Sequence, residues 1–479
     1  MNSIFSKRTK IVVTLGPATE TREAVKELIL AGANVFRLNT SHGTMENHRE
    51  KIRMVKEVAA GMGVYAATMV DLQGPKIRIG NLKEEIEIKN GDKLVFEHLE
   101  GQDGQKDGTI PVDYKGLSND VTKGSRILID DGKLEVIVDD VEDGKVYATV
   151  TNGGILKSRK GLNIPGSTAS LDAVTPKDVE FIKFAAEEKA DLIALSFVRK
   201  KEDVLLCKKY INDFDASIPV VSKLEKPDAI KNLAEIVSVS DAIMVARGDL
   251  GIELSPVEVP ICQKLIIDEA NKQRKPVIVA TQMLESMINE PIPTRAEASD
   301  VANAILDGTD AVMLSGETSV GKFAIDAVRM MSKIAITTEG SAFYKFDTDK
   351  EMADDVALTR QAVVFGADKM LKYVNAKAIL SFSHFGYSTR LMSKLKPSAP
   401  VIMVSDMEET CRKMALAWGV YPFCKKWDAI VDQGLLLKID EFLINEVGLK
   451  QNDYVVITGS APRLISGRTN FVRVHKIGT

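Results

Sequence analysis

Charged and hydroxyl-bearing residues end, or directly follow, several short apolar runs of this chain. One run ends with an arginine and an asparagine two positions apart, and another ends with Lys223 and Glu225 in the same spacing. Side chains alternate along a strand, so residues two positions apart lie on one face and can act on the same molecule. The residues placed in this way are Arg37, Asn39, Ser41, Asp71, Lys223, Glu225, Asp249 and Thr281.

The residue types in this set favour a hard cation next to a phosphate. The carboxylates come without histidine or cysteine, which favours Mg²⁺ over zinc or copper. Arginine and lysine beside a divalent ion suit a phosphate or a developing oxyanion, and phosphoryl transfer needs that combination. The turn Gly248-Asp249-Leu250-Gly251 also exposes backbone N–H groups to an anion. A lone charged residue at a strand end is more often a surface ion pair, but recurrence at successive strand ends favours a site.

The apolar runs alternate with helical stretches, a pattern typical of parallel α/β units. Eight such runs favour a closed (β/α)₈ barrel, in which the chemistry lies at the carboxyl ends of the strands. An open, doubly wound sheet is the alternative, because strand count alone does not establish closure. The runs are Ile11–Leu15, Asn34–Asn39, Tyr65–Asp71, Leu192–Phe197, Pro219–Leu224, Ala242–Ala246, Pro276–Thr281 and Ala311–Ser315.

Two further regions depart from this alternation. Between Pro75 and Leu171 the chain carries six Asn-Gly or Asp-Gly pairs, a strong hairpin signal that predicts a separate β domain. A polar stretch, Thr337–Lys350, is expected to link the barrel to a small α/β domain. In that domain the runs predict helices near 354–371 and 432–447 and strands at 378–382, 401–404, 454–458 and 471–476. The expected domains are the barrel at 1–73 and 172–340, an inserted β-barrel lid at 74–171, and a C-terminal, candidate allosteric domain at 341–479.

Composition excludes several classes of protein. The net charge of −4 over 479 residues gives no indication of a nucleic-acid-binding chain. The four cysteines form no C-x-x-C pair, which favours a reducing compartment over a disulfide framework or a zinc site. Neither a signal peptide nor a membrane-spanning apolar run is visible. We expect a cytoplasmic protein without membrane or nucleic-acid partners.

Longer motifs resemble those of the pyruvate kinase family, in the family's order. The most specific is Asp300–Thr318 (DVANAILDGTDAVMLSGET). The others are Lys10–Pro17 (KIVVTLGP), Arg37–Gly43 (RLNTSHG), Asp71–Arg78 (DLQGPKIR), Met244–Gly251 (MVARGDLG), Ala280–Leu284 (ATQML) and Pro293–Glu297 (PTRAE). The resemblance implies a homotetrameric phosphotransferase that moves the phosphoryl group of phosphoenolpyruvate to ADP, giving pyruvate and ATP in the final step of glycolysis.

The resemblance also implies roles for matching residues. Lys223 would stabilise the phosphoryl group in flight and the enolate left behind, and Arg37 would contact the phosphate. Glu225 and Asp249 would hold Mg²⁺, or Mn²⁺ in its place. The carboxylate end of phosphoenolpyruvate would lie among Gly248, Asp249 and Thr281.

The remaining implied roles concern the nucleotide and the proton. Thr281 would neighbour the water or relay that protonates the enolate. The inserted domain would close as a lid and exclude water, which strengthens every charge contact inside. The nucleotide-binding residues would be Asn39, His42, Arg78 and Lys160.

The motif around Asp71 departs from that of K⁺-requiring relatives, which resemble Asp-Thr-Lys-Gly-Pro-Glu-Ile-Arg. Here Leu72 stands in place of the threonine and Lys76 in place of the glutamate. The monovalent-cation positions would be Asn39, Ser41, Asp71 and Leu72. An ammonium group at position 76 could supply the positive charge that K⁺ supplies elsewhere. We therefore hypothesise that activity does not require K⁺.

A loop in the C-terminal region is a candidate effector site, because relatives carry a Ser/Thr-rich loop there for a sugar phosphate. Hydroxyls and backbone N–H groups at a helix start suit a phosphate. An ordinary helix N-cap at Ser388 or Thr389 explains the same residues equally well. The candidate hydroxyls belong to Ser381, Ser383, Ser388 and Thr389, and His384, Phe385 and Tyr387 interrupt them.

Two other functions are open at this stage. A carbon–carbon lyase or aldolase could use Mg²⁺, Glu225, Asp249 and the turn at Gly248 to stabilise a pyruvate enolate, although it needs no nucleotide lid. A catalytically dead metabolite sensor would require the loss of a catalytic group, and every matching group is present.

Overall fold

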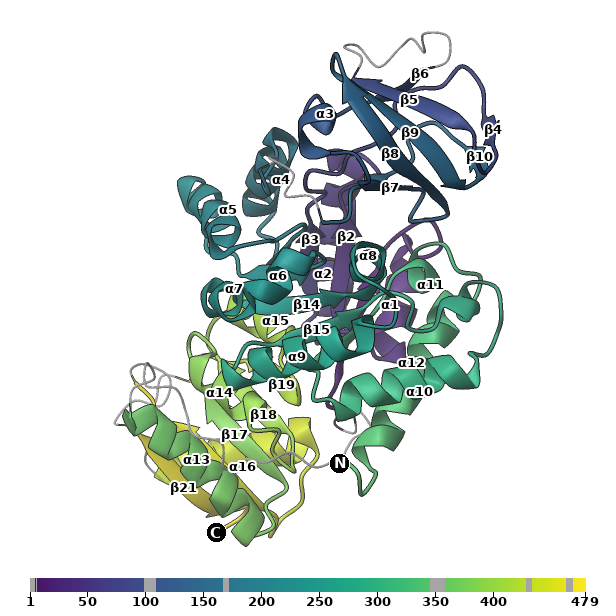
Figure 1. The fold of residues 1–479 in the computed structure, drawn as a ribbon. Coiled ribbons are helices and arrows are strands. Elements are labelled where there is room, and N and C mark those ends of the chain that lie inside the picture. The colour runs from purple at the N-terminus through teal and green to yellow at the C-terminus, as the bar shows by residue number, and fades with distance from the viewer. Residues whose placement is uncertain are drawn as a thin grey trace.

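The computed structural model describes Phe5 and residues 7–98, 109–166, 172–344, 358–427, 433–461 and 468–479. Its centre is built from the parallel strands β1 (Lys10–Thr14), β2 (Val35–Asn39), β3 (Ala67–Asp71), β12 (Leu192–Leu195), β13 (Val220–Leu224), β14 (Ala242–Ala246), β15 (Val277–Ala280) and β16 (Ala311–Leu314). They close in the order β1-β16-β15-β14-β13-β12-β3-β2, in the middle of the molecule (Figure 1). The predicted eight-stranded barrel is confirmed, and the open sheet is wrong.

Burial on both faces explains why the barrel strands read as continuous apolar runs. All five residues of β1 are buried. Val12 packs inside the barrel with Met244, whereas Ile11 and Val13 pack outward against the helix layer. The barrel interior and the helix layer are therefore filled by alternate residues of the same strands.

Helices surround the barrel, and local caps determine where several of them begin. Thr294 and Glu297 form a capping box, so the motif at 293–297 starts a helix. Glu297 also accepts hydrogen bonds from Ser286, which attaches this helix to the preceding 3-10 helix, η2 (Glu285–Ile288). The predicted linker from Thr337 begins inside a helix that ends at Glu339. The elements are α1 (Arg22–Ala31), α2 (Met45–Gly61), α4 (Pro176–Glu187), α5 (Lys201–Asp213), α6 (Pro227–Lys231), α7 (Leu233–Val239), α8 (Arg247–Glu253), α9 (Val259–Lys272), η2 (Glu285–Ile288), α10 (Arg295–Leu306), α11 (Gly316–Ser319) and α12 (Ala324–Glu339).

The region between β3 and α4 forms a separate β structure. Its elements are β4 (Ile86–Ile88), β5 (Lys93–His98), β6 (Thr109–Val112), α3 (Leu117–Asp120), β7 (Arg126–Ile129), β8 (Leu134–Glu142), β9 (Lys145–Asn152), β10 (Gly154–Leu156) and β11 (Leu162–Asn163). Six strands form one sheet in the order β11-β7-β8-β9-β5-β6. Arg78 bridges to Gly161 beside β11, and Ile79 bridges to Val112 in β6, so this segment joins the two edges of the sheet. The positive φ of Asp143 and its glycine neighbour matches one predicted turn, whereas the predicted turns at 103–104 and 107–108 lie outside the described residues.

The C-terminal region forms a five-stranded sheet in the order β19-β18-β17-β20-β21, parallel except for β21. One strand was missed by the sequence reading, because Pro422 lies within it and proline is found mainly in edge strands such as this one. The elements are α13 (Leu358–Tyr373), β17 (Ala378–Phe382), α14 (Tyr387–Lys394), β18 (Val401–Ser405), α15 (Glu408–Lys413), η3 (Met414–Leu416), β19 (Val420–Cys424), α16 (Gln433–Phe442), η4 (Leu443–Val447), β20 (Tyr454–Gly459) and β21 (Phe471–Lys476).

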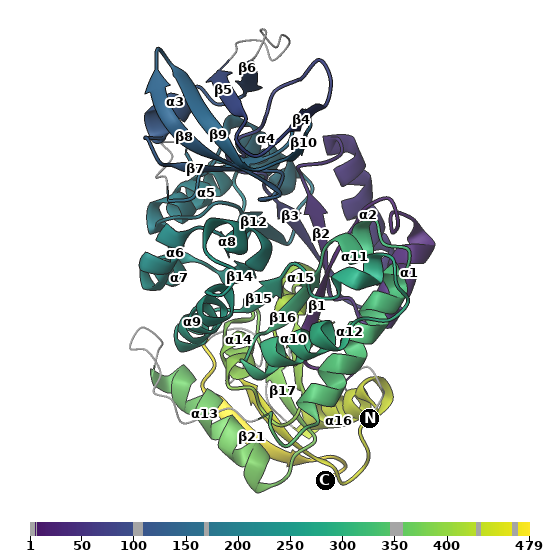
Figure 2. The same ribbon diagram turned by 45° about the vertical axis from the view of Figure 1, so that its right-hand side comes forward.

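The C-terminal domain closes the floor of the barrel, at the end opposite the inserted sheet (Figure 2). Ala415 and Leu416 of η3 join the buried cluster of the barrel interior. Beside them, Asp310 forms salt bridges of 2.5 Å with Lys394 and 2.9 Å with Lys396, and all three side chains are nearly inaccessible. Within the described ranges, no helix is both long and apolar enough to cross a bilayer.

Candidate functional site

Four side chains from neighbouring strands meet at the carboxyl end of the barrel. The Arg37 Nε atom lies 2.5 Å from Asp71 Oδ2. The Lys223 Nζ atom lies 3.3 Å from Asp71 Oδ1 and 2.8 Å from Glu225 Oε1. Arg37 lies within β2, Asp71 ends β3, and Lys223 and Glu225 lie at and just beyond the end of β13, so the barrel brings together residues far apart in the sequence, as the strand-end pattern predicts.

Opposite charges hold this cluster in its ionised form. Burial alone would raise the pKa of Asp71, but Lys223 and Arg37 outweigh it, and the net pKa lies below its ordinary value. Burial alone would lower the pKa of Lys223, yet Asp71 and Glu225 raise it above its ordinary value. Lys223 therefore carries a positive charge at neutral pH, in a site with little solvent to screen it.

Ser196, one residue beyond β12, is a member of the cluster that the sequence reading missed. Its hydroxyl accepts a 2.8 Å hydrogen bond from Lys223 Nζ and donates a 2.7 Å bond to the carbonyl oxygen of Leu72. A serine after an apolar run carries no charge pattern, so only the three-dimensional contact reveals it. Ser196 fixes the direction in which the ammonium group points.

Glu225 and Asp249 suit a divalent cation. Glu225 is buried, and one of its oxygens accepts a 3.0 Å hydrogen bond from the backbone N–H of Phe197. The other, Oε1, lies beside Lys223 but outside hydrogen-bond geometry. Burial raises the pKa of Glu225, Lys223 opposes this, and the charge of Asp249 on α8 raises it further. A divalent ion would relieve both the unsatisfied oxygen and the repulsion between the carboxylates.

Glu225 and Asp249 alone are too few to coordinate a metal ion entirely with protein ligands. Within the described part of the chain, no three His, Cys, Asp or Glu residues gather as a metal-binding group. Mg²⁺ is commonly bound by one or two carboxylates, with substrate oxygens and water completing its shell. Glu225 and Asp249 therefore fit Mg²⁺ that binds together with a phosphate-bearing substrate.

Gly248 and Thr281 are joined across neighbouring strand ends. The backbone N–H of Gly248 donates a 2.8 Å hydrogen bond to Thr281 Oγ1, so this N–H is occupied rather than free for an anion. The φ of Thr281 is 70°, a left-handed conformation uncommon for threonine. Arg247 supports the turn by donating a 2.8 Å hydrogen bond to the carbonyl oxygen of Thr281 and pairing with Asp300 at 2.7 Å. Strain held by such surroundings is typical of functional sites.

The residues predicted for the nucleotide lie at the edges of the inserted domain and are partly engaged elsewhere. Lys160 Nζ forms a 2.8 Å salt bridge with Asp130. Arg78 Nη1 donates a 3.1 Å hydrogen bond to the carbonyl oxygen of Arg159. His42 is exposed, and Asn39 is half-buried beside the cluster at the end of β2.

A network links the inserted domain to α8. Glu253 Oε1 accepts a 3.0 Å hydrogen bond from Asn163 Nδ2 of β11 and lies 2.5 Å from Lys226 Nζ. Lys226 directly follows Glu225, and α8 also carries Asp249. The buried Glu253 thus holds together the two segments that carry the acids, and the sequence reading did not anticipate it.

Lys76 and the C-terminal hydroxyls are also placed. Within the described residues, the half-buried Lys76 ammonium has no hydrogen bond or ion pair, and its side chain lies against Gly161. In the C-terminal domain, Ser381 and Thr389 hydrogen-bond to each other at 2.9 Å, and Ser388 hydrogen-bonds to Thr469 at 2.5 Å. Ser383 is also buried. These pairs favour a structural role for three of the four candidate effector hydroxyls.

Comparisons with known proteins agree over nearly the whole chain. A family model described as "Pyruvate kinase, barrel domain" matches residues 6–328, and one described as "Pyruvate kinase, alpha/beta domain" matches residues 361–475. The pyruvate kinases of Staphylococcus aureus strains USA300 and bovine RF122 are each 41% identical over 483 residues, covering 98% of this chain and 81% of theirs. The crystal structure of a pyruvate kinase from Cryptosporidium parvum superposes with a TM-score of 0.91 at 33% identity, covering 99% of this chain and 97% of that one.

Proposed function

Because this chain belongs to the pyruvate kinase family, we propose that the cluster of Arg37, Asp71, Lys223 and Glu225 is where it moves the phosphoryl group of phosphoenolpyruvate to ADP. The observation that carries the proposal is the position of the Lys223 ammonium group, held between two carboxylates and Ser196 at the barrel mouth. The family match favours this reaction over a lyase and over a dead sensor.

The mechanism follows from the charges. Glu225 and Asp249 would hold Mg²⁺, which supplies positive charge to the phosphate oxygens. Lys223 neutralises charge on the phosphoryl group while that group moves from the oxygen of phosphoenolpyruvate to an oxygen of ADP, and it then stabilises the enolate. Arg37, fixed by Asp71, offers its remaining N–H donors to the phosphate.

The carboxylate end of phosphoenolpyruvate is assigned to Gly248, Asp249 and Thr281. The Thr281 hydroxyl donates to the carbonyl oxygen of Ala280 at 2.5 Å and accepts from Gly248, so its orientation is set. A hydroxyl already used as a donor is suited to holding a water molecule through its free lone pair. That water would deliver the proton to the enolate carbon.

The inserted domain is proposed as a lid that carries nucleotide-binding residues. Arg78 and Lys160 lie in the segments that connect it to the barrel, and binding of ADP would draw them from their present partners to its phosphates. Asn39 and His42 would face the nucleotide from β2. We retain the domain limits 1–73 with 172–340, 74–171, and 341–479, because β1 to β3 precede and β12 to β16 follow the inserted strands.

A coupled assay tests the reaction and the metal together. Purified protein is expected to form pyruvate from phosphoenolpyruvate only when both ADP and Mg²⁺ are present. Excess EDTA should abolish turnover, and added Mg²⁺ or Mn²⁺ should restore it, because the phosphate charge is otherwise uncompensated. Pyruvate formation without ADP, or undiminished turnover in EDTA, would contradict the proposal.

Independence of K⁺ is proposed on the basis of Lys76. Lys76 is half-buried and its ammonium group is, within the described residues, unpaired, so it is available to supply the positive charge that K⁺ supplies elsewhere. The positions that would hold K⁺ elsewhere are Asn39, Ser41, Asp71 and Leu72. Leu72 is fully buried and offers only its carbonyl oxygen, which already accepts from Ser196.

An effector site in the loop after β17 is proposed with a phosphorylated metabolite as its ligand. The loop lies where β17 neighbours β20, which is where the strand order of the sheet reverses and open α/β sheets bind ligands. Ser383 offers its hydroxyl there, while Ser381, Ser388 and Thr389 support the loop. Dialysed enzyme is expected to be activated by at least one member of a panel of phosphorylated metabolites. Lack of activation by the whole panel would make this loop structural.

Assembly and location are carried over from the family as proposals. We propose a homotetramer in the cytoplasm. Light scattering on the purified chain tests the assembly, and a monomer mass would refute it. Cell fractionation tests the location, and enzyme found outside the cytosolic fraction would refute that part.

A further inference from the structure

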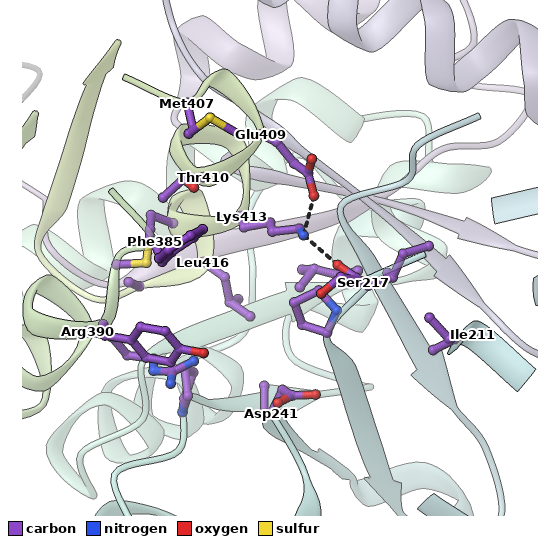
Figure 3. A pocket seen from close by; sticks show the side chains of 18 of the residues that line it. Ile211, Ser217, Asp241, Phe385, Arg390, Met407, Glu409, Thr410, Lys413 and Leu416 are labelled. Atoms are coloured by element: carbon purple, nitrogen blue, oxygen red, sulfur yellow. Dashed lines mark hydrogen bonds and ion pairs between the residues drawn. The ribbon is translucent and has the colours of Figure 1, made fainter. Parts of the chain in front are cut away.

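A cavity of about 470 Å³ lies beneath the barrel, between its floor and the C-terminal domain (Figure 3). The barrel contributes Leu192, Pro219 and Ala242, which precede or begin β12, β13 and β14. The C-terminal domain contributes residues of the loop after β17, of α14 and of α15. The opposite ends of the same three strands carry Ser196, Lys223, Glu225 and Asp249, so the cavity belongs to a different site from the catalytic one.

Most charges in the cavity wall are paired. Lys413 lies between Glu409 and the carbonyl oxygen of Ser217, as the dashed lines of Figure 3 mark. Lys208 forms a 2.8 Å salt bridge with Asp241. The two acids of the wall, Asp241 and Glu409, are each paired with a lysine, so these four groups together contribute little net charge.

Arg390 differs from these groups. Its side chain is half-buried, and it makes no hydrogen bond or ion pair with any residue in the described part of the chain. Its guanidinium lies 5.3 Å from the ring centroid of Tyr387. A guanidinium has five donors, and leaving them unused in a partly desolvated place is costly.

A second arginine approaches the same ring. The Arg360 guanidinium lies 5.9 Å from the Tyr387 ring centroid, and its buried Nε atom has no hydrogen-bond partner among the described residues. The Tyr387 ring compensates part of the charge through cation–π contact. Of the two arginines, Arg390 lines the cavity, so its guanidinium offers donors that an oxyanion bound there would satisfy.

The rim adds a flat apolar surface. Phe385 is 69% exposed and Tyr387 is 54% exposed, both unusual for aromatic residues that line a cavity. Met407 is 39% exposed beside them. Aromatic and methionine side chains at a cavity mouth favour a planar partner, on which rings stack and a thioether packs.

We propose that this cavity binds an organic anion in which a phosphate or carboxylate is attached to a flat ring. Arg390 holds the oxyanion, Phe385 and Tyr387 hold the ring, and Arg360 adds positive charge beside Tyr387. Such a ligand bridges the C-terminal domain and the starts of the strands that carry the catalytic groups. Phe385 belongs to the loop after β17, but the cavity is lined by the aromatic and arginine side chains of this segment, whereas Ser381 pairs with Thr389 and Ser388 with Thr469.

Calorimetry on the full chain tests the proposal with simple probes. Phenyl phosphate and benzoate carry a ring with either anion, whereas inorganic phosphate and ribose 5-phosphate lack the flat ring. Phosphoenolpyruvate and Mg²⁺ are kept saturating so that the catalytic cleft is occupied. One ring anion or both should bind at one site per chain, with a dissociation constant at least about ten-fold below that of either ringless probe.

Variants locate the site. Arg390→Met should weaken binding of the ring anion by about ten-fold or more, because it removes a charged hydrogen-bonding partner. Arg390→Lys keeps the charge and should give an intermediate loss, which separates recognition from misfolding. Arg473→Met, an exposed arginine on β21, serves as the matched control and should leave binding unchanged. No saturable binding of either ring anion, equal binding in Arg390→Met, or equal affinity for ribose 5-phosphate would each overturn the proposal.

Discussion

Replacing Lys223 with methionine is expected to lower turnover by about 10³-fold or more while the protein still binds phosphoenolpyruvate and Mg²⁺. Loss of a single preorganised donor to a developing oxyanion costs on the order of 10²–10³ in turnover, and Lys223 also carries a full charge. Its work lies mainly in the transition state, so turnover should fall far more than substrate affinity. Steady-state kinetics of pyruvate formation and calorimetric binding of phosphoenolpyruvate with Mg²⁺ measure the two effects separately.

The variant also leaves acids without their cation. Asp71 keeps Arg37, but Glu225 loses the ammonium 2.8 Å from its Oε1 atom. Unless a metal ion is bound, Glu225 is then expected to become more readily protonated, because burial already raises its pKa. Adding Mg²⁺ should therefore raise the melting temperature of this variant more than that of the parent.

A matched control separates the loss of a catalytic group from the loss of a lysine charge in general. Lys231→Met removes a lysine only eight positions along the chain, but its side chain is 74% exposed and pairs with Asp228. Turnover of this variant should stay within about two-fold of the parent, because exposed ion pairs contribute little. A Lys223→Met enzyme with near-normal turnover would refute the assigned role.

The strand-end residues were predictable because a closed parallel barrel places the carboxyl ends of all its strands at one face, where residues from successive strand ends lie close together. Lys223 and Glu225 share a face through the two-residue period of a strand, and parallel closure brings them to Asp71. Side-chain pairings between distant segments were not predictable in this way. Asn163, Lys226 and Glu253 meet across 90 and 27 positions of sequence, and no local pattern marks their contact.

Errors in the sequence reading have similar physical causes. The N–H of Gly248 looked free for an anion, yet a left-handed Thr281 places its hydroxyl as the acceptor. Serines and threonines after β17 looked available to a phosphate, but burial made Ser381 and Thr389 satisfy each other. A pattern rich in hydroxyls thus indicates hydrogen bonding without indicating the partner. A pattern of charged residues at strand ends is more specific, because a buried charge is costly unless an opposite charge lies beside it.

Replacing Lys76 with glutamate is expected to make activity depend on K⁺. In K⁺-free buffer, turnover of the variant should fall on the order of 10²-fold, the cost of losing one positive contribution to a phosphoryl-transfer site. Added K⁺ should restore a large part of this turnover, because the variant carries a free carboxylate at position 76 and has lost the ammonium group that would compete with K⁺ for the same place. The parent enzyme should change by less than about two-fold when K⁺ replaces tetramethylammonium at equal ionic strength, so that screening is constant.

The contrast with a neighbouring lysine shows whether position or net charge is responsible. Lys89→Glu makes the same change of charge at an exposed position of the inserted domain, and it should leave both turnover and the response to K⁺ as in the parent. Lys76 differs from Lys89 because it is half-buried, lies against Gly161 at the base of the insert, and has no partner among the described residues. If K⁺ strongly stimulates the parent enzyme, the ammonium group does not act in its place, and Asp71 must then share Arg37 and Lys223 with a bound K⁺ ion.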